Sequence, residues 1–341
     1  MEDDPKYQKI YKNTQAILYG GLIGSILSHN RSKTDSSKNY YLSCFELCKN
    51  MALYIGGKPY IDPLLKNPNR VGLTKKSRST EEIHNDRPRW TEGFVNLWEF
   101  LARNHREERS YDPFTRYIFA AVLKHSLPPS GDIDYTRMFV LTGPVSLLMS
   151  DNNIDTTMIR YFTQNNYKNT CPKMIAILGA YIKILKFTYT GCSLETLVLL
   201  TLEYTKTDPF IYPMINFARL ISVDSKSINN IDIQIYGIRN KELLKEPVYL
   251  LCFVLAIVWK RWNSTLYDIL EELYLYTDQE IVYIMVVQFF LVKNAASVDG
   301  VSVITDIINE YRYMEDFKGV GHICNQLAGE VYRYKDINKI L

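Results

Sequence analysis

Two apolar runs decide the fold that this sequence predicts: Val248–Trp259 (VYLLCFVLAIVW) and Ile281–Val292 (IVYIMVVQFFLV). A membrane-spanning helix takes about 20 predominantly apolar residues, whereas runs of about 10–14 are typical of helices buried in a protein core. Lys260 closes the first run, and Gln288 interrupts the second before Lys293 closes it, as expected for helices whose ends reach water. We therefore predict two helices that are buried on most faces, and no membrane span.

Working outward from these runs, most of the chain repeats apolar residues with the 3.6-residue period of helices. The predicted helices are Tyr7–Ser28, Tyr40–Tyr54, Thr91–Arg103, Pro113–His125, Met138–Met149, Asp155–Phe162, Pro172–Phe187, Ser193–Tyr204, Pro209–Ile221, Pro247–Trp262, Thr265–Tyr276, Asp278–Ala296, Val301–Tyr313 and Leu327–Tyr334. Only Ser222–Lys241 contains a short alternating piece, which is either irregular or a minor strand. The pattern predicts an all-α fold in one large domain over residues 1–341, with a polar excursion at about 57–90.

Composition agrees with a globular protein that has a core of its own. Of the 341 residues, 47% are hydrophobic and 23% are charged, close to globular averages, which excludes wholesale disorder. A net charge of +3 is too small for a protein whose main task is coating nucleic acid. Six scattered cysteines and a polar, acidic N-terminus favour an intracellular location, in the cytoplasm or nucleus. Abundant Lys, Asn, Ile and Tyr suggest an AT-rich genome, such as that of certain large DNA viruses or protists. For a viral protein the compartment is that of the host cell.

The polar excursion holds a basic cluster that is the candidate for contact with nucleic acid. Its members are Lys66, Arg70, Lys75, Lys76 and Arg78. They could neutralise phosphates, but acidic residues follow directly, and no aromatic residue lies among them to stack on bases. A solvated loop is the favoured interpretation of this cluster.

Searches for catalytic and metal-binding motifs point to structural roles. Cys44 and Cys48 would share one helix face, but no further cysteine or histidine pair has zinc-type spacing. We therefore predict no metal centre and no cofactor. Gly20–Gly24 (GGLIG) lies in an apolar helical pattern, where small residues allow two helices to approach closely. Thr277 and Glu280, three residues apart before the second apolar run, predict a capping box at a helix start.

Several fragments, taken in order, resemble the ADP-ribosylglycohydrolase family. They are Gly20–Ser28, Gly131–Met138, Pro144–Leu148, Thr170–Gly191, Ser193–Glu195 and Leu275–Ile281. The resemblance covers roughly the whole chain and rests on order and hydrophobic pattern more than on identities. It implies an all-α globule and, in the family, hydrolysis assisted by two magnesium ions that carboxylates hold.

The residues at the family's ligand positions differ from that pattern. Ser25 stands at the aspartate position of the first helix, and Asn39 lies where a pair of aspartates is expected. Near the second apolar run, Thr277 and Gln279 replace two aspartates, and Asp278 is one residue out of phase. Uncharged oxygens bind Mg²⁺ far more weakly than carboxylates do.

The resemblance therefore implies a catalytically inactive relative with an interaction or structural role and an unidentified protein partner. Its degenerate site would comprise Ser25, Asn39, Thr277, Asp278, Gln279 and Glu280. One alternative is an active, divergent hydrolase that uses Asp278, Glu280, Asp132 or Asp134. Another is a binding module that holds ADP-ribose or nucleic acid without chemistry.

Overall fold

The computed structural model describes residues 3–31, 139, 143, 146–147, 171–223, 243–297, 300–311 and 320–337. Within these ranges 85% of residues are helical and none lies in a strand, so the fold is all-α. The buried apolar side chains of the helices form one continuous core. The helices predicted between residues 32 and 137 and at Asp155–Phe162, the polar excursion, and most of Met138–Met149 and of Ser222–Lys241 lie outside the described residues.

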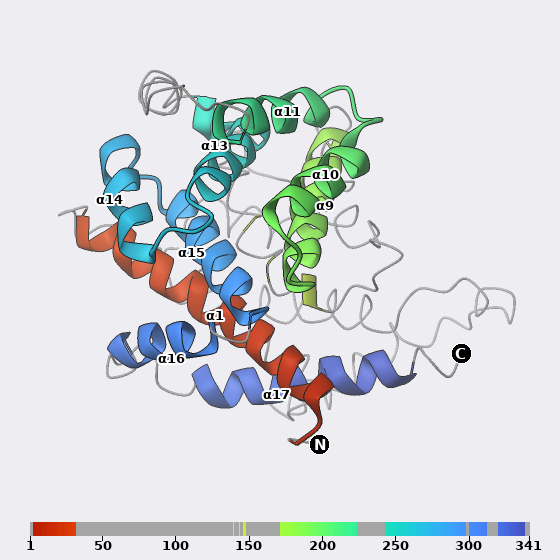
Figure 1. Ribbon diagram of the computed structural model, residues 1–341, viewed down its shortest axis with the longest axis vertical. Coiled ribbons are helices and arrows are strands. Elements are labelled where there is room, and N and C mark those ends of the chain that lie inside the picture. Colours follow the sequence, from red (N-terminus) through yellow and green to blue (C-terminus); the bar gives the residue numbers. More distant parts are fainter. Residues whose placement is uncertain are drawn as a thin grey trace, which may run out of the picture.

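Figure 1 shows the described helices crossing one another around the middle of the molecule. They are α1 (Pro5–Arg31), α9 (Cys171–Tyr189), α10 (Leu194–Thr205), α11 (Ile211–Ser222), the short 3-10 helix η6 (Leu243–Lys245), α13 (Pro247–Lys260), α14 (Leu266–Tyr276), α15 (Glu280–Ala295), α16 (Gly300–Tyr311) and α17 (Val320–Ile337). α1 and α15 pack against each other over much of their length, and α16 and α17 lie beside α1. On the other side, α9 and α11 pack against α13, and α10 packs against α9 and α11.

The two apolar runs form the centre of the core, as predicted. In α13, every residue from Leu250 to Trp259 is buried, and in α15 the same holds from Ile281 to Val292. A helix that is apolar all round has no face suited to water, so it must be covered on every side. The other helices therefore arrange themselves around α13 and α15.

The close approach predicted for the glycines of α1 is confirmed. A Cβ on Gly24 would lie 2.6 Å from the Cα of Ile284, and one on Gly20 would lie 2.8 Å from the Cα of Gln288. Both distances are to backbone atoms of α15, which cannot rotate away as a side chain can. The absence of a side chain at these two positions is therefore what allows α1 to contact α15 directly.

Local signals place several helix ends correctly. Pro172 lies in the first turn of α9, where its missing N–H removes no helical hydrogen bond. Gly191 follows that helix with a φ of +74°, a conformation that glycine adopts without strain. Ser193 caps α10 by accepting a hydrogen bond from the Thr196 N–H. These boundaries follow from side chains within a few residues of each helix end.

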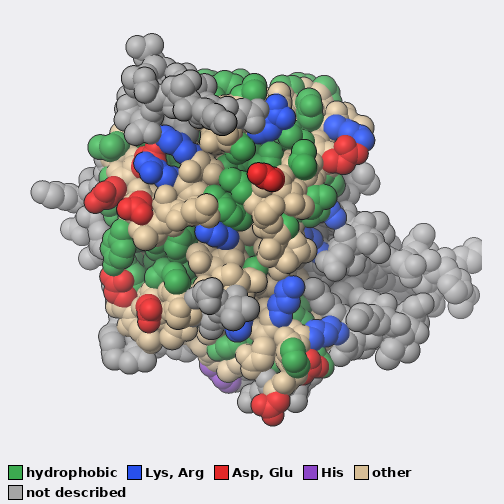
Figure 2. Space-filling view, viewed as in Figure 1, with side chains coloured by type: hydrophobic (Ala, Val, Ile, Leu, Met, Phe, Trp, Pro, Cys, Tyr) green, Lys and Arg blue, Asp and Glu red, His purple; other side chains and the backbone are tan. Residues whose placement is uncertain are grey.

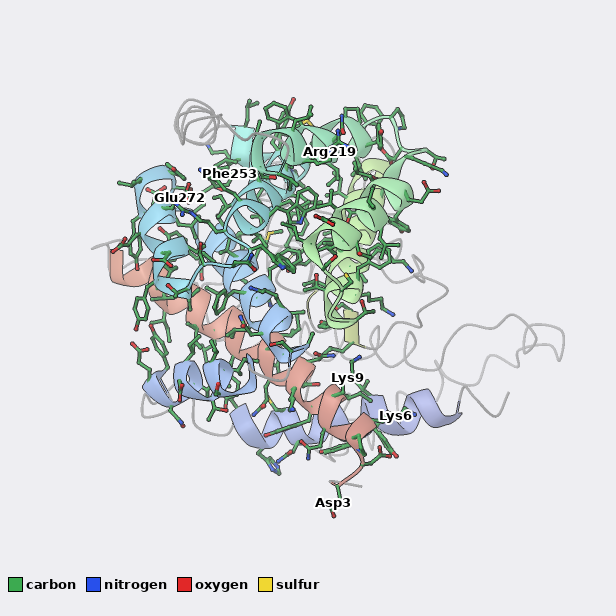
Figure 3. The ribbon with its side chains drawn as sticks, in the orientation of Figure 1. Asp3, Lys6, Lys9, Arg219, Phe253 and Glu272 are labelled. Carbon is green, nitrogen blue, oxygen red and sulfur yellow. The ribbon has the colours of Figure 1, made fainter. Side chains whose placement is uncertain are left out.

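The last helix is longer than the predicted Leu327–Tyr334, because packing on α1 extends it. Val320, Cys324 and Ala328, spaced four residues apart, are buried along one face of α17. Near the chain's beginning, the Tyr7 and Tyr332 rings meet edge to face at 5.8 Å. Lys6, labelled in Figure 3, places its Nζ 5.1 Å from the centre of the Tyr332 ring. The start of α1 is thus attached to the end of α17.

Candidate functional site

The first candidate site lies where α1 meets the start of α15, and it brings together two of the six predicted residues, Ser25 and Glu280. Ser25, only 2% exposed on α1, donates its hydroxyl to the Oε1 of Glu280, the first residue of α15. The neighbouring Gly24 makes this contact possible, since a Cβ there would lie 2.7 Å from the Tyr283 carbonyl oxygen. Two backbones in contact thus bring a small hydroxyl to a carboxylate that is 255 residues away in sequence.

Thr277 lies in the turn between α14 and α15, and each of its polar groups serves that turn. Its N–H donates to the Leu273 carbonyl at 3.1 Å and closes α14. Its hydroxyl accepts the Gln279 N–H at 3.1 Å, and its carbonyl accepts the Tyr283 hydroxyl at 3.0 Å. Thr277 is therefore a buried connector of two helices.

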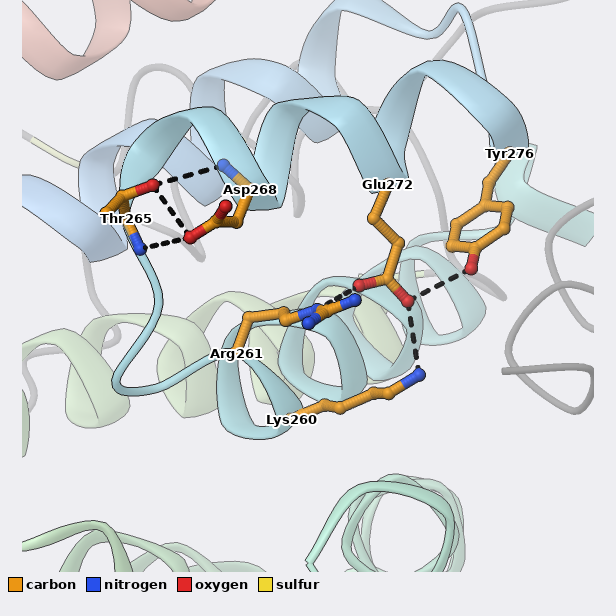
Figure 4. A network of polar contacts seen from close by, with 6 residues as sticks. All are labelled: Lys260, Arg261, Thr265, Asp268, Glu272 and Tyr276. Carbon is orange, nitrogen blue, oxygen red and sulfur yellow. Dashed lines mark hydrogen bonds and ion pairs between the residues drawn. The ribbon is translucent and has the colours of Figure 1, made fainter. Parts of the chain in front are cut away.

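The capping box predicted at Thr277 and Glu280 is wrong. α15 begins at Glu280 itself, and Gln279 occupies the capping position without a side-chain hydrogen bond among the described residues. Thr277 bonds two residues ahead, and Glu280 is turned toward Ser25, because packing against α1 takes precedence over the local motif. A capping box does form one helix earlier, between Thr265 and Asp268 (Figure 4).

The remaining predicted site residues fall into two groups. Asp278 is exposed and Gln279 is half-buried, both in the turn before α15. Asn39 lies outside the described residues, as do Asp132, Asp134 and the basic cluster of the polar excursion. Within the described part of the chain, no group of three or more His, Cys, Asp or Glu side chains is arranged to hold a metal ion.

A second polar cluster surrounds Glu272 of α14, and sequence reasoning did not identify it (Figure 4). The carboxylate is only 5% exposed and accepts hydrogen bonds from Arg261 Nε, from Lys260 Nζ at 3.2 Å and from the Tyr276 hydroxyl at 3.0 Å. Burial alone would raise the pKa of Glu272, but the Arg261 hydrogen bond, the Lys260 charge and the remaining donors together hold this pKa below its usual value.

One signal in the sequence could have revealed this cluster. Glu272 occupies the apolar side of α14, three residues after Ile269 and four before Tyr276, both buried. An acidic residue on a buried helix face is stable only with a cationic partner nearby, because an unpaired buried charge is costly. Lys260 and Arg261, which end the preceding apolar run, supply two. The contacts stabilise the packing of α14 on the end of α13.

A third polar cluster is fully buried around Gln288 of α15. The Tyr181 hydroxyl of α9 donates to Gln288 Oε1 at 2.9 Å, and Gln288 Nε2 donates to the Ile17 carbonyl of α1 at 3.1 Å. Gln288 interrupts the second apolar run, and its amide is buried between three helices. Both ends of the amide are paired, as a buried polar group requires.

The surface of the described part has one concentration of large apolar side chains. Seven of the eleven large hydrophobic residues that it exposes belong to α10, α11 and the turn between them. We call them the α10–α11 apolar face: Leu199, Leu200, Tyr204, Phe210, Tyr212, Phe217 and Leu220. Figure 2 shows hydrophobic side chains gathered along this side of the molecule, at the top of the view. Periodicity could not reveal this face, because it does not distinguish an apolar surface from a core.

Comparison with known proteins adds no assignment: no protein-family model matches the chain, and no curated protein matches it. Among the helices described, none offers the long apolar stretch that a membrane crossing takes. The function is therefore inferred from the geometry of the candidate sites.

Proposed function

We propose that this chain is a helical, ADP-ribosylglycohydrolase-like protein that acts by binding another protein chain and not by hydrolysis. The observation that carries the interaction role is the α10–α11 apolar face. Monomeric proteins rarely expose contiguous apolar patches of more than a few hundred Å². Aromatic side chains, of which this face has four, are enriched at protein interfaces.

The non-catalytic part of the proposal is supported by what the hydroxyls of Ser25 and Thr277 do. In this chain the Ser25 hydroxyl is used on Glu280 and the Thr277 hydroxyl on the Gln279 N–H. The Ser25 hydroxyl joins two helices, and the Thr277 hydroxyl holds the turn between α14 and α15, so both have structural roles. Neither hydroxyl carries the negative charge that Mg²⁺ prefers in its ligands.

Hydrolysis is tested directly with the purified chain. Incubated with Mg²⁺ and an ADP-ribosylated protein, it should release no ADP-ribose above the protein-free control. The double variant Asp278→Ala with Glu280→Ala should give the same result. Release that depends on Mg²⁺ and is abolished in the double variant would show an active hydrolase and overturn the proposal.

The interaction role is tested by site-specific photo-crosslinking in the cells that express the chain. A photoreactive amino acid is placed at Leu199, which is 65% exposed on α10, or at Leu275, which is 66% exposed on α14. The two positions match in residue type and exposure. A discrete crosslinked protein species is expected from position 199 and not from position 275. Equal crosslinking from both positions would speak against an interaction face on α10 and α11.

The alternative binding roles are tested with defined ligands. Calorimetry with ADP-ribose should give no heat of binding. Titration with DNA or RNA should give no salt-dependent binding, because the net charge is small. Saturable binding of either ligand would favour a nucleotide-binding module over a protein-binding one.

A further inference from the structure

We propose that the α10–α11 apolar face is the contact surface of a symmetric homodimer, in which it packs against the same face of a second copy of this chain. The inference rests on the proposed interaction role and names the partner. Four properties of the face support it: the composition of the two helices, their charge, the fixed position of one aromatic side chain and the surface area available for contact.

Both helices expose large apolar side chains in addition to the apolar side that faces the core, and α10 also exposes Glu195, Thr196 and Glu203. α10 buries Leu197, Val198 and Leu202 while it exposes Leu199 and Leu200. In α11, Ile211, Ile215 and Ala218 face inward while Phe217 and Leu220 face outward. Surface helices normally carry a polar outer face, and helices that are apolar all round are normally covered. α11 therefore has the composition of a buried element, and α10 has it in part, although the described part of the chain covers only one side of each helix.

The charges on these helices suit a face that meets a copy of itself. Residues 194–222 hold three acidic and two basic side chains, so the region is close to neutral. Glu203 and Lys206 at the end of α10 form an ion pair with each other. In a two-fold dimer the same patch occurs on both sides of the interface, so a strongly charged patch would repel itself. A nearly neutral patch that contains both signs does not.

One aromatic residue of the face is already held in position. Lys183 of α9 places its Nζ 5.2 Å from the centre of the Phe187 ring and 5.9 Å from that of Tyr204, within the range of cation–π attraction. The Tyr204 hydroxyl also lies 3.7 Å from where a Cβ of Gly179 would be, so the ring is laid across α9. A side chain ordered before binding loses less entropy when an interface forms.

The available area is sufficient for a stable dimer. The seven side chains are between 37% and 65% exposed. At roughly 200 Å² for a fully exposed side chain of this size, they offer about 600 Å² per chain. Two copies would bury about 1,200 Å² from these side chains alone, which reaches the lower end of the standard size range of specific interfaces.

The test measures the mass of the purified chain by sedimentation equilibrium across a wide concentration range. The wild-type chain should approach twice the monomer mass of 39.7 kDa as its concentration rises. Leu199→Glu and Phe217→Glu should each raise the dimer dissociation constant by about 30-fold or more, because a buried carboxylate without a partner is placed at the interface twice. Leu275→Glu is the matched control and should leave the dissociation constant unchanged. Circular dichroism confirms that each variant is folded.

Hydrogen exchange gives a readout that needs no variant. Amides of residues 194–222 should exchange more slowly at dimeric than at monomeric concentrations, and those of α14 should not change. A wild-type chain that stays monomeric at high concentration would overturn the dimer, as would a dimer whose protection lies elsewhere. A monomer that binds a different protein through this face would overturn the dimer and leave the proposed function intact. Mg²⁺-dependent release of ADP-ribose would overturn the proposed function whatever mass is measured.

Discussion

The Ser25 hydroxyl on α1 donates a hydrogen bond to the carboxylate of Glu280 at the start of α15. Ser25 is buried and Glu280 is half-buried, so the contact is partly shielded from water. The family resemblance draws attention to the same two regions of sequence, and in this chain their side chains join two packed helices. This contact is the natural first target for mutation.

Removal of the Ser25 hydroxyl should destabilise the protein. For Ser25→Ala we expect a loss of about 1–2 kcal/mol in the free energy of unfolding, since a hydrogen bond to a charged group is lost. Glu280→Gln should cost less, because its side chain can still accept the bond. Urea denaturation of Ser25→Ala, of Glu280→Ala, which removes the acceptor, and of the Ser25→Ala/Glu280→Ala double variant measures the coupling. Strictly additive effects would show that the two side chains do not interact.

Substitution of Gly24 tests the contact between the backbones of α1 and α15. Gly24→Ala should destabilise the protein by about 2–3 kcal/mol, because the new methyl group would overlap the Ile284 backbone. Gly179→Ala is the matched control, since its nearest neighbour would be the Tyr204 hydroxyl at 3.7 Å. That variant should gain about 0.5–1 kcal/mol from the higher helix propensity of alanine. Thermal denaturation compares the two, and equal effects would contradict the close approach at Gly24.

Protonation of Glu272 should weaken the packing of α14 on α13. Its folded-state pKa lies below the ordinary value of 4.5, so the contribution of this carboxylate to stability is present above pH 4.5. That contribution is lost as the pH falls from 4.5 through the lowered folded-state pKa. Glu272→Gln should reduce stability at pH 7 by about 1–3 kcal/mol and flatten the acid side of the pH profile.

A control for this experiment is Glu203→Gln, which removes an exposed carboxylate from the Glu203–Lys206 ion pair. Exposed ion pairs contribute little to stability, so this variant should behave like the wild type at pH 7. Urea denaturation at several pH values measures all three proteins. A Glu272→Gln profile that keeps the wild-type slope below pH 4.5 would be the contrary result.

The Gln288 amide should contribute to the stability of the protein only because it pairs with two buried polar groups. Gln288→Leu leaves the Tyr181 hydroxyl and the Ile17 carbonyl without these partners, at a cost of about 2–4 kcal/mol. Adding Tyr181→Phe removes one of the stranded groups and should restore about 1 kcal/mol of that loss. Denaturant unfolding of the single and double variants measures both steps. A double variant no more stable than Gln288→Leu would rule out the Tyr181 hydrogen bond as the cause.

Much of the described fold could be predicted because its causes are local. The apolar runs around Val254 and Val286 identified the two central helices, because the length and the apolar pattern of a run are enough to predict a buried helix. Pro172, Gly191 and Ser193 located helix ends through their own backbone and side-chain preferences. The packing role of the GGLIG glycines also followed from residue size alone.

The candidate sites were less predictable, because each depends on residues far apart in sequence. A capping box was predicted from the residue types at Thr277 and Glu280. In the structure, however, Glu280 bonds to Ser25 of α1 and does not take part in capping. Gln288 interrupts an apolar run in the sequence, and only the structure shows that α1 and α9 supply partners for its amide inside the core. At Thr277 a tertiary contact outweighed a capping preference that is worth about 1 kcal/mol. At Gln288 tertiary hydrogen bonds satisfied a buried amide.

By itself, the sequence determined that this is an all-α protein, which helices lie at its centre and where several of them end. Those features arise from interactions over three or four residues, which a linear pattern records. Only the tertiary structure decided that Ser25 meets Glu280, that Glu272 is buried between Lys260 and Arg261, and that α10 and α11 expose apolar side chains. Each of these depends on which helix faces surround one another, and burial is a property of the packed molecule.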